Sequence, residues 1–153
     1  MGSILVGTGE DIAKARRVRK LFGGALRQAG IVAAAALYAL DHHVDRLRDD
    51  HDNAQLFASR IEQVPGIQVN AGEVETNLVF FDVDPSCGTA GQLSTRLAGK
   101  GVFINASGPQ RLRACTHLDV SRDDALRAAE AISESMHEGL LSAASAAAGP
   151  YSR

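Results

Sequence analysis

The sequence has 153 residues, of which 45% are hydrophobic and 22% charged, and its formal net charge is -2. This length and composition suit one globular domain with a core and exclude a disordered or fibrous chain. The charge argues against nucleic-acid or anionic-membrane binding, because both need a clustered positive surface. The longest apolar run, residues 31–40, is about half as long as a bilayer span requires, so we expect no membrane contact.

Cys87 and Cys115 are too few and too widely spaced for a disulfide framework or a zinc site. Residues 1–7 lack the basic and apolar regions of a secretory signal. We therefore expect two free thiols in a cytoplasmic protein. Three histidines, His42, His43 and His51, have no carboxylate or cysteine pattern beside them, so a solvated helix face is expected and no metal site.

The first part of the chain is predicted to be mostly helical. Residues 3–6 form a short β-like run, and the turn that follows leads into a helix ended by Gly23 and Gly24. Apolar residues at helical spacing then predict one long helix from about residue 27 to about residue 51. Its middle, residues 33–36, consists of alanine, which suits close packing against a larger body or another subunit.

Beyond residue 51 the patterns alternate between helices and strands. Helices are predicted to start after the capping residues Asp52 and Ser121, and another helix is predicted at residues 89–97. Strands are predicted at residues 67–69, 77–83, 102–105 and 111–117. Residues 77–83 are rich in β-branched and aromatic side chains and predict a central buried strand.

The alternation in residues 111–117 assigns Arg111, Arg113 and Cys115 to one face of a strand. Three or four mostly antiparallel strands with helices on one face pack this order of elements most economically. The predicted fold class is therefore α+β.

Two parts of the sequence resemble L-threonine aldolases, which are lyases of fold type I that depend on pyridoxal 5'-phosphate (PLP). The first is Arg-Lys-Leu-Phe-Gly-Gly-Ala-Leu-Arg-Gln-Ala-Gly at residues 19–30. The second comprises Val-Phe-Ile-Asn-Ala-Ser at residues 102–107 and Arg-Ala-Cys-Thr-His-Leu-Asp-Val-Ser at residues 113–121. The resemblance covers residues 2–136 and implies a PLP-transferase-like small domain.

The resemblance also implies a domain organisation. Residues 1–52 match the tail of the large PLP-binding domain with its connector helices, and residues 53–138 match the C-terminal small domain. The Ala- and Ser-rich residues 139–153 are expected to be a frayed tail.

By the resemblance, Arg27 matches an arginine near the phosphate of PLP, and Arg113 matches one that holds the substrate α-carboxylate. A guanidinium beside a glycine-rich turn at a helix start can bind phosphate, and its planar fork can hold a carboxylate through two parallel hydrogen bonds. Ala25 stands where the family usually has a third glycine. Without the resemblance, a surface or ion-paired arginine is the alternative interpretation of both residues.

The family lysine that binds PLP covalently precedes the segment matched by Gly2 and Ser3. The lysines present, Lys14, Lys20 and Lys100, do not match it. We therefore expect no catalytic residue for the covalent step in this sequence and no activity of the chain alone. One hypothesis is that a valine codon was read as the start at Met1.

The family cleaves L-threonine or allo-threonine to glycine and acetaldehyde, so the resemblance implies a small amino-acid substrate. It also implies a partner, either a second copy of the chain or an N-terminal half. Two alternatives stay open. The first is a non-catalytic module for self-association or regulation, with the Ala-rich helix at residues 30–40 as the interface. The second is a fragment of another fold-type-I PLP enzyme.

Overall fold

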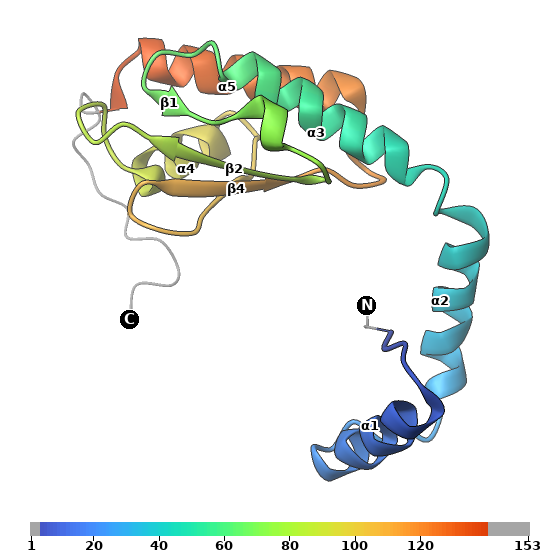
Figure 1. The fold of residues 1–153 in the computed structure, drawn as a ribbon. Coiled ribbons are helices and arrows are strands. Elements are labelled where there is room, and N and C mark those ends of the chain that lie inside the picture. The colour runs from blue at the N-terminus through green and yellow to red at the C-terminus, as the bar shows by residue number, and fades with distance from the viewer. Residues whose placement is uncertain (1–3, 141–153) are drawn as a thin grey trace. The chain divides into compact units, whose positions relative to one another are not determined.

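The computed structural model describes residues 4–140 (Figure 1). The chain divides into two compact units, an N-terminal unit Met1–Arg46 and a C-terminal unit Leu47–Arg153. The tail predicted to be frayed lies almost wholly outside the described residues.

Within residues 4–46 the N-terminal unit contains two helices, α1 (Gly9–Leu21) and α2 (Ala29–His42). The Thr8 side chain caps α1 by accepting a hydrogen bond from the Asp11 backbone amide at 3.2 Å. Gly23, with φ +77°, lies in the turn after α1, as its sequence predicts. The β-like run is wrong for residues 4–6, which form no strand because no other strand pairs with them.

The single long helix predicted from residue 27 to residue 51 is wrong. Helix α2 ends at His42, and α3 (Leu47–Ile61) starts after a turn of four residues. Asp52 therefore lies inside α3 rather than capping it. The acidic pair Asp49 and Asp50 lies in the first turn of α3, where carboxylates are favoured by the helix dipole. Continuous apolar spacing concealed this break.

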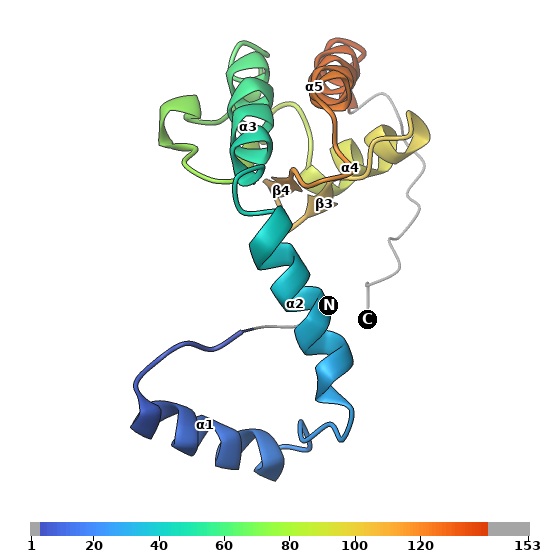
Figure 2. The same ribbon diagram turned by 90° about the vertical axis from the view of Figure 1, so that its right-hand side faces the viewer.

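The C-terminal unit contains a four-stranded antiparallel sheet, and this confirms the predicted α+β fold. Its strands in sheet order are β1 (Ile67–Gln68), β2 (Leu78–Val83), β4 (Arg111–Cys115) and β3 (Asn105–Ala106). Figure 2 shows β4 beside β3. Strand β3 is shorter than predicted, because residues 102–104 pair with no strand.

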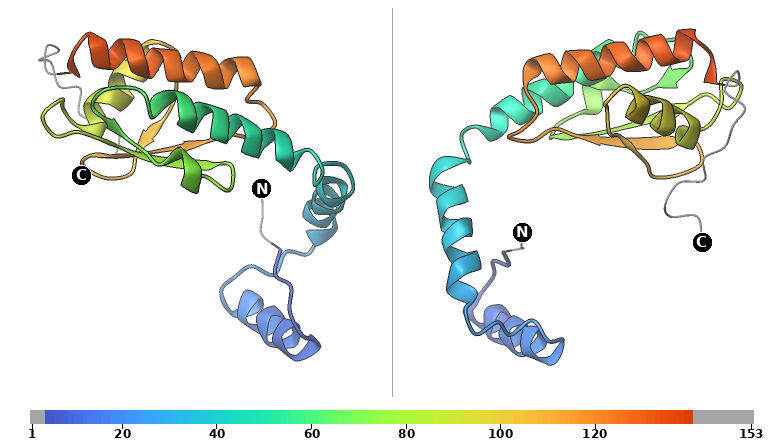
Figure 3. Two further views of the ribbon diagram at one scale, coloured as in Figure 1. Left: turned by 45° about the horizontal axis from the view of Figure 1, so that its top comes forward. Right: turned by 180° about the vertical axis from the view of Figure 1, so that it is seen from behind.

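Helices cover one face of this sheet. Helices α3 and α5 (Arg122–His137) lie side by side over it, and α4 (Ala90–Gly99) packs against α5 and β3 (Figure 3). The core between the helices and the sheet contains large side chains with less than 2% of their surface exposed: Ile61, Val79, Phe81, Val83, Leu93, Leu97, Leu112, Ile132 and Leu140. Burial of these side chains is the main force that holds the C-terminal unit together.

The last two helices begin with capping boxes. At the start of α4, the Thr89 side chain accepts a hydrogen bond from the backbone amide of Gln92. At the start of α5, the Ser121 side chain accepts one from the backbone amide of Asp124. The predicted cap of the final helix is thus confirmed. Hydrogen bonds from Ser121, and then the interaction with Arg127, lower the pKa of Asp124 to about 2.

Candidate functional site

The face of the sheet opposite the helices carries the candidate site. Strand β2 alternates, so that Val79 and Phe81 are buried while Phe80 is 49% exposed. The prediction for β2 is therefore right about its central place and wrong about burial on both sides. We call this surface the open face and define it by the outward side chains of three strands: Phe80, Asp82, Asn105, Arg111, Arg113 and Cys115.

Arg111 is neutralised on the open face. Its Nε donates to Asp82 Oδ1 at 2.9 Å and its Nη2 to Asp82 Oδ2 at 2.8 Å, a bidentate ion pair between neighbouring strands. The hydrogen bonds from Arg111 lower the pKa of Asp82, and Asp82 in turn raises the pKa of Arg111. Both groups stay charged at neutral pH, and each satisfies the other.

Arg113 lies two residues further along the same strand and the same face. It is exposed, and within residues 4–140 its side chain makes no hydrogen bond or ion pair. Its neighbours across the sheet are Phe80 on β2 and Asn105 on β3. Arg113 therefore presents an unoccupied guanidinium, which is suited to an anionic ligand.

The chain just after β4 is tied firmly to α3. The buried Thr116 hydroxyl donates to the Asp50 carbonyl at 2.6 Å, and the Asn53 side chain donates to the Val120 carbonyl at 3.1 Å. The side-chain amide of Asn77 also donates a hydrogen bond to the Thr116 carbonyl at 2.7 Å. These anchors restrict the end of the strand that carries Arg113. Sequence reasoning missed them, although polar residues on buried faces were their signal.

Arg27 lies in the N-terminal unit, in the turn before α2, and is exposed. Helix α2 has no acidic residue in its first turn, and the side chain of Gln28 at its N-cap makes no capping hydrogen bond. The first backbone amides of α2 and the guanidinium two residues before it thus fit a phosphate group. Because Arg27 and Arg113 belong to different units, the structure defines the surroundings of each one separately.

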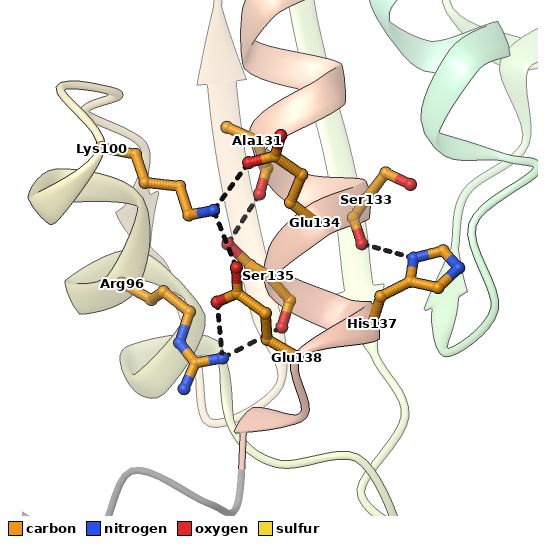
Figure 4. A network of polar contacts seen from close by, with 8 residues as sticks. All are labelled: Arg96, Lys100, Ala131, Ser133, Glu134, Ser135, His137 and Glu138. Carbon is orange, nitrogen blue, oxygen red and sulfur yellow. Dashed lines mark hydrogen bonds and ion pairs between the residues drawn. The ribbon is translucent and has the colours of Figure 1, made fainter.

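Neither Lys14 nor Lys100 is a free amine. Lys100 Nζ contacts Glu134 Oε2 at 2.7 Å and Glu138 Oε1 at 3.3 Å, in a network that joins α4 to α5 (Figure 4). The hydrogen bond that Lys100 donates to Glu134 is the main cause that raises the pKa of Lys100. Lys14 pairs with Glu10 at 2.7 Å. An amine that attacks an aldehyde must be neutral, so these ion pairs oppose that role.

A PLP enzyme needs groups that bind the cofactor phosphate and the substrate carboxylate, and an amine that anchors the cofactor. The residues present fit the first two of these roles. Arg27 fits the phosphate of the cofactor, and Arg113 fits the carboxylate of an amino acid. Lys14 and Lys100 are paired, and Lys20 lies exposed in the last turn of α1. None of the three is at the position that matches the family lysine. The assignments of Arg27 and Arg113 stay predictions.

Other candidate groups add little to the site. Cys87 and Cys115 are free thiols, as predicted, and Cys115 lies on the open face with its Sγ 3.3 Å from Asn77 Nδ2. His117 is exposed, and its Nδ1 accepts from the Asp119 amide at 3.3 Å. Among residues 4–140, no three histidine, cysteine or acidic side chains could jointly hold a metal ion. No helix in this part of the chain is long and apolar enough to cross a membrane.

Comparison with solved structures defines the class of fold. The chain is similar to a mutant of C-DES with glycine covalently linked to its PLP cofactor, with a TM-score of 0.56 and 18% identity over 69% of this chain and 28% of that one. It is also similar to the cystine C-S lyase C-DES in complex with cysteine persulfide, at the same TM-score and coverage. The fold is that of PLP-dependent enzymes of fold type I.

Sequence comparison then gives the family. The beta-eliminating lyase family matches residues 1–84, and the chain belongs to this family. It is 39% identical to low-specificity L-threonine aldolase 1 of Arabidopsis thaliana over 81% of its own length. It is 43% identical to the low-specificity L-threonine aldolase of Escherichia coli O157:H7 over 80% of its length. The predicted resemblance to threonine aldolases is confirmed, with PLP as the family cofactor. The chain spans 35% of the length of these relatives.

Proposed function

We propose that this chain forms the C-terminal part of a threonine aldolase that depends on PLP. In this proposal Arg113 binds the α-carboxylate of L-threonine or allo-threonine, and Arg27 binds the phosphate of PLP. The observation that carries the proposal is the unpaired Arg113 on the open face, beside an Arg111 that Asp82 already satisfies. The similarity to low-specificity L-threonine aldolases supports the choice of substrate.

The contribution of these residues to the reaction is binding and orientation. PLP, when bound, withdraws electrons from the α-carbon of the amino acid and so weakens the bond to the β-carbon. Arg113 would hold the carboxylate by two parallel hydrogen bonds, which fixes rotation of the amino acid about its α-carbon. The hydrogen bonds of Thr116 and Asn77 keep the end of β4 in place. Binding of the carboxylate by Arg113 therefore requires little further ordering of this strand.

We propose further that the covalent anchor for PLP comes from polypeptide other than this sequence, and that the chain alone is inactive. Residues 1–52 would then be the tail of the large PLP-binding domain with its connectors, and residues 53–138 the small domain. We also place the protein in the cytoplasm, where its two free thiols would stay reduced.

A chimaera tests the proposal directly. The N-terminal two thirds of the E. coli aldolase would be joined to this chain, and acetaldehyde release from L-threonine measured. We expect activity that Arg113→Ala lowers roughly 10-fold to 100-fold in kcat/KM, the range for a lost charged hydrogen-bonding group. Arg122→Ala, which removes another exposed arginine of the same unit, is the matched control. Equal activity of the two variants would remove Arg113 from the substrate site.

The claim of inactivity has its own test. The 153-residue chain would be incubated with PLP, reduced with borohydride and digested for mass spectrometry. We expect no lysine peptide that carries the phosphopyridoxyl mass. Stoichiometric labelling of one lysine, together with acetaldehyde release from L-threonine, would show that the chain is an enzyme by itself.

A second candidate function is self-association through α2. No residue of α2 is buried, and its apolar side chains Ile31, Leu37 and Leu40 are 76%, 61% and 56% exposed. An exposed apolar surface of this kind marks an interface. Light scattering would give the oligomeric state, and Leu37→Glu is expected to shift it toward the monomer. A monomer before the substitution would remove this candidate.

A further inference from the structure

We infer that Asn105 is a second ligand of the anion site, whose side-chain amide donates to the same carboxylate that Arg113 binds. This inference rests on the proposed function, because it takes the amino-acid carboxylate as the ligand. It adds a residue to the site and a reason for its preference for a carboxylate.

The register of β3 and β4 places the two side chains together. Asn105 pairs with Arg113, and Ala106 pairs with Leu112. Residues directly opposite each other in an antiparallel pair lie on the same face, with Cβ atoms about 4.5–5.5 Å apart. Leu112 is fully buried against the helices, so Asn105 and Arg113 lie on the open face.

The Asn105 amide has no partner within residues 4–140, unlike the other three asparagines of the sequence. Those three donate to the Val120 carbonyl, to Glu73 Oε1 and to the Thr116 carbonyl, from Asn53, Asn70 and Asn77 respectively. Their hydrogen bonds hold loops and helix ends in place. The Asn105 side chain makes no such structural hydrogen bond, and it lies exposed beside the unpaired guanidinium of Arg113.

The backbone around Asn105 is nevertheless held at both ends. The Ser94 hydroxyl donates to the carbonyl of the buried Ile104 at 2.7 Å, and the Ser107 amide donates to the Arg111 carbonyl at 2.8 Å. These bonds fix the short strand against α4 and β4. The backbone that carries the Asn105 side chain is thus positioned in advance, which lowers the entropic cost of binding a ligand.

The charges of the open face indicate which anion fits. Asp82 neutralises Arg111, so one positive charge, that of Arg113, remains among these strands. A carboxylate accepts about four hydrogen bonds; a guanidinium fork supplies two, and a neutral amide supplies another without a second charge. This combination favours a singly charged carboxylate over a phosphate dianion. Phe80, on the other side of Arg113, offers an apolar wall and no donor.

Nuclear magnetic resonance can test the pair in the full 153-residue chain, with sodium acetate and glycine as probes. The signals to follow are the Arg113 Nε–H and the Asn105 side-chain amide. We expect both to shift with one common dissociation constant. Asn105→Ala should weaken binding about 2-fold to 10-fold, the range for a neutral hydrogen bond, and Asn105→Gln should restore part of it.

Asn105→Asp is the sharper variant, because it places a fixed carboxylate beside Arg113 and should abolish binding of the added one. Ala106→Asp adds the same charge at the next residue, whose side chain points away from the open face, and should change binding little. Thermal midpoints of both variants show whether each remains folded.

The outcomes separate this inference from the proposed function. A shift of Arg113 alone, or unchanged binding by folded Asn105→Asp, overturns the role of Asn105 and leaves Arg113 as the carboxylate ligand. If neither signal moves, Arg113 is not a carboxylate ligand and the proposed function loses its support. Joint movement, loss of binding in Asn105→Asp and retention in Ala106→Asp support the pair.

Discussion

The two units of the chain differ in what stabilises their helices. Every buried hydrophobic side chain within residues 4–140 belongs to the C-terminal unit, and the N-terminal unit has none. Both units nevertheless show good local helix signals, such as the Thr8 cap of α1 and the Ser121 cap of α5. Isolated helices of about 12–15 residues are marginal in water. Capping and propensity can start α1 and α2, but only burial can make a helix stable.

This contrast agrees with the proposed place of each unit in a larger enzyme. The C-terminal unit has a core of its own and can hold Arg113 in a fixed position. In this proposal the N-terminal unit, with 13-residue α1 and 14-residue α2, would pack against another protein surface that covers its apolar side chains. Arg27 would gain a fixed position only when that surface is present.

The largest effect that tests the contrast is expected from a core truncation. Phe81 is 1% exposed, and its ring packs edge-on against Phe57 with centroids 6.0 Å apart. Phe81→Ala should lower the free energy of unfolding by about 3–5 kcal/mol, because it removes buried apolar surface and leaves a cavity. Leu37→Ala in α2, where the leucine is 61% exposed, should change it by less than about 0.5 kcal/mol. Urea unfolding followed by circular dichroism measures both, and similar losses would show that the two units share one core.

Much of the C-terminal unit could be predicted from the sequence, because its signals are local. The caps of α4 and α5 need only a hydroxyl and a side chain three residues on. Alternation alone assigned Arg111, Arg113 and Cys115 to one face of β4, and the burial pattern confirms it. These features depend on neighbours within one turn or one strand.

The features that could not be predicted depend on distant parts of the chain. The ion pair of Arg111 with Asp82 joins residues 29 apart in sequence, so only the register of β2 and β4 reveals it. The pairing of Asn105 with Arg113 likewise follows from register alone. Phe80 was expected to be buried because it is aromatic, yet its exposure is decided by which face the helices cover.

A smaller effect is expected from the helix caps, and it compares the two units by the same chemistry. Ser121→Ala removes the acceptor for the Asp124 amide at the start of α5 and should lower the free energy of unfolding of the C-terminal unit by about 0.5–2 kcal/mol. Thr8→Ala removes the matching acceptor at α1 and should reduce helix content without moving that transition. Circular dichroism gives the helix content, and following it through urea unfolding gives the free energy of unfolding. A shift of the main transition by Thr8→Ala would contradict the separation of the units.

The smallest effect is expected from the pH dependence of the same cap. The pKa of Asp124 is about 2 in the folded chain, below the ordinary value of 3.8, because Ser121 and Arg127 interact with its charged form. A lowered pKa stabilises the folded chain above pH 3.8, and this contribution disappears as the pH falls through about 2.

Asp124→Asn should therefore lower the thermal midpoint of the C-terminal unit at pH 7, and the gap to the parent chain should close between about pH 4 and about pH 2. Asp11→Asn, at the equivalent place in the α1 cap, should leave that midpoint unchanged at every pH. A gap for Asp124→Asn that stays constant down to pH 2 would mean that the asparagine acts through packing rather than charge. Closure of the gap would show that the charge of Asp124 stabilises α5, and no effect of Asp11→Asn would show that the same cap stabilises only the helix that the core holds in place.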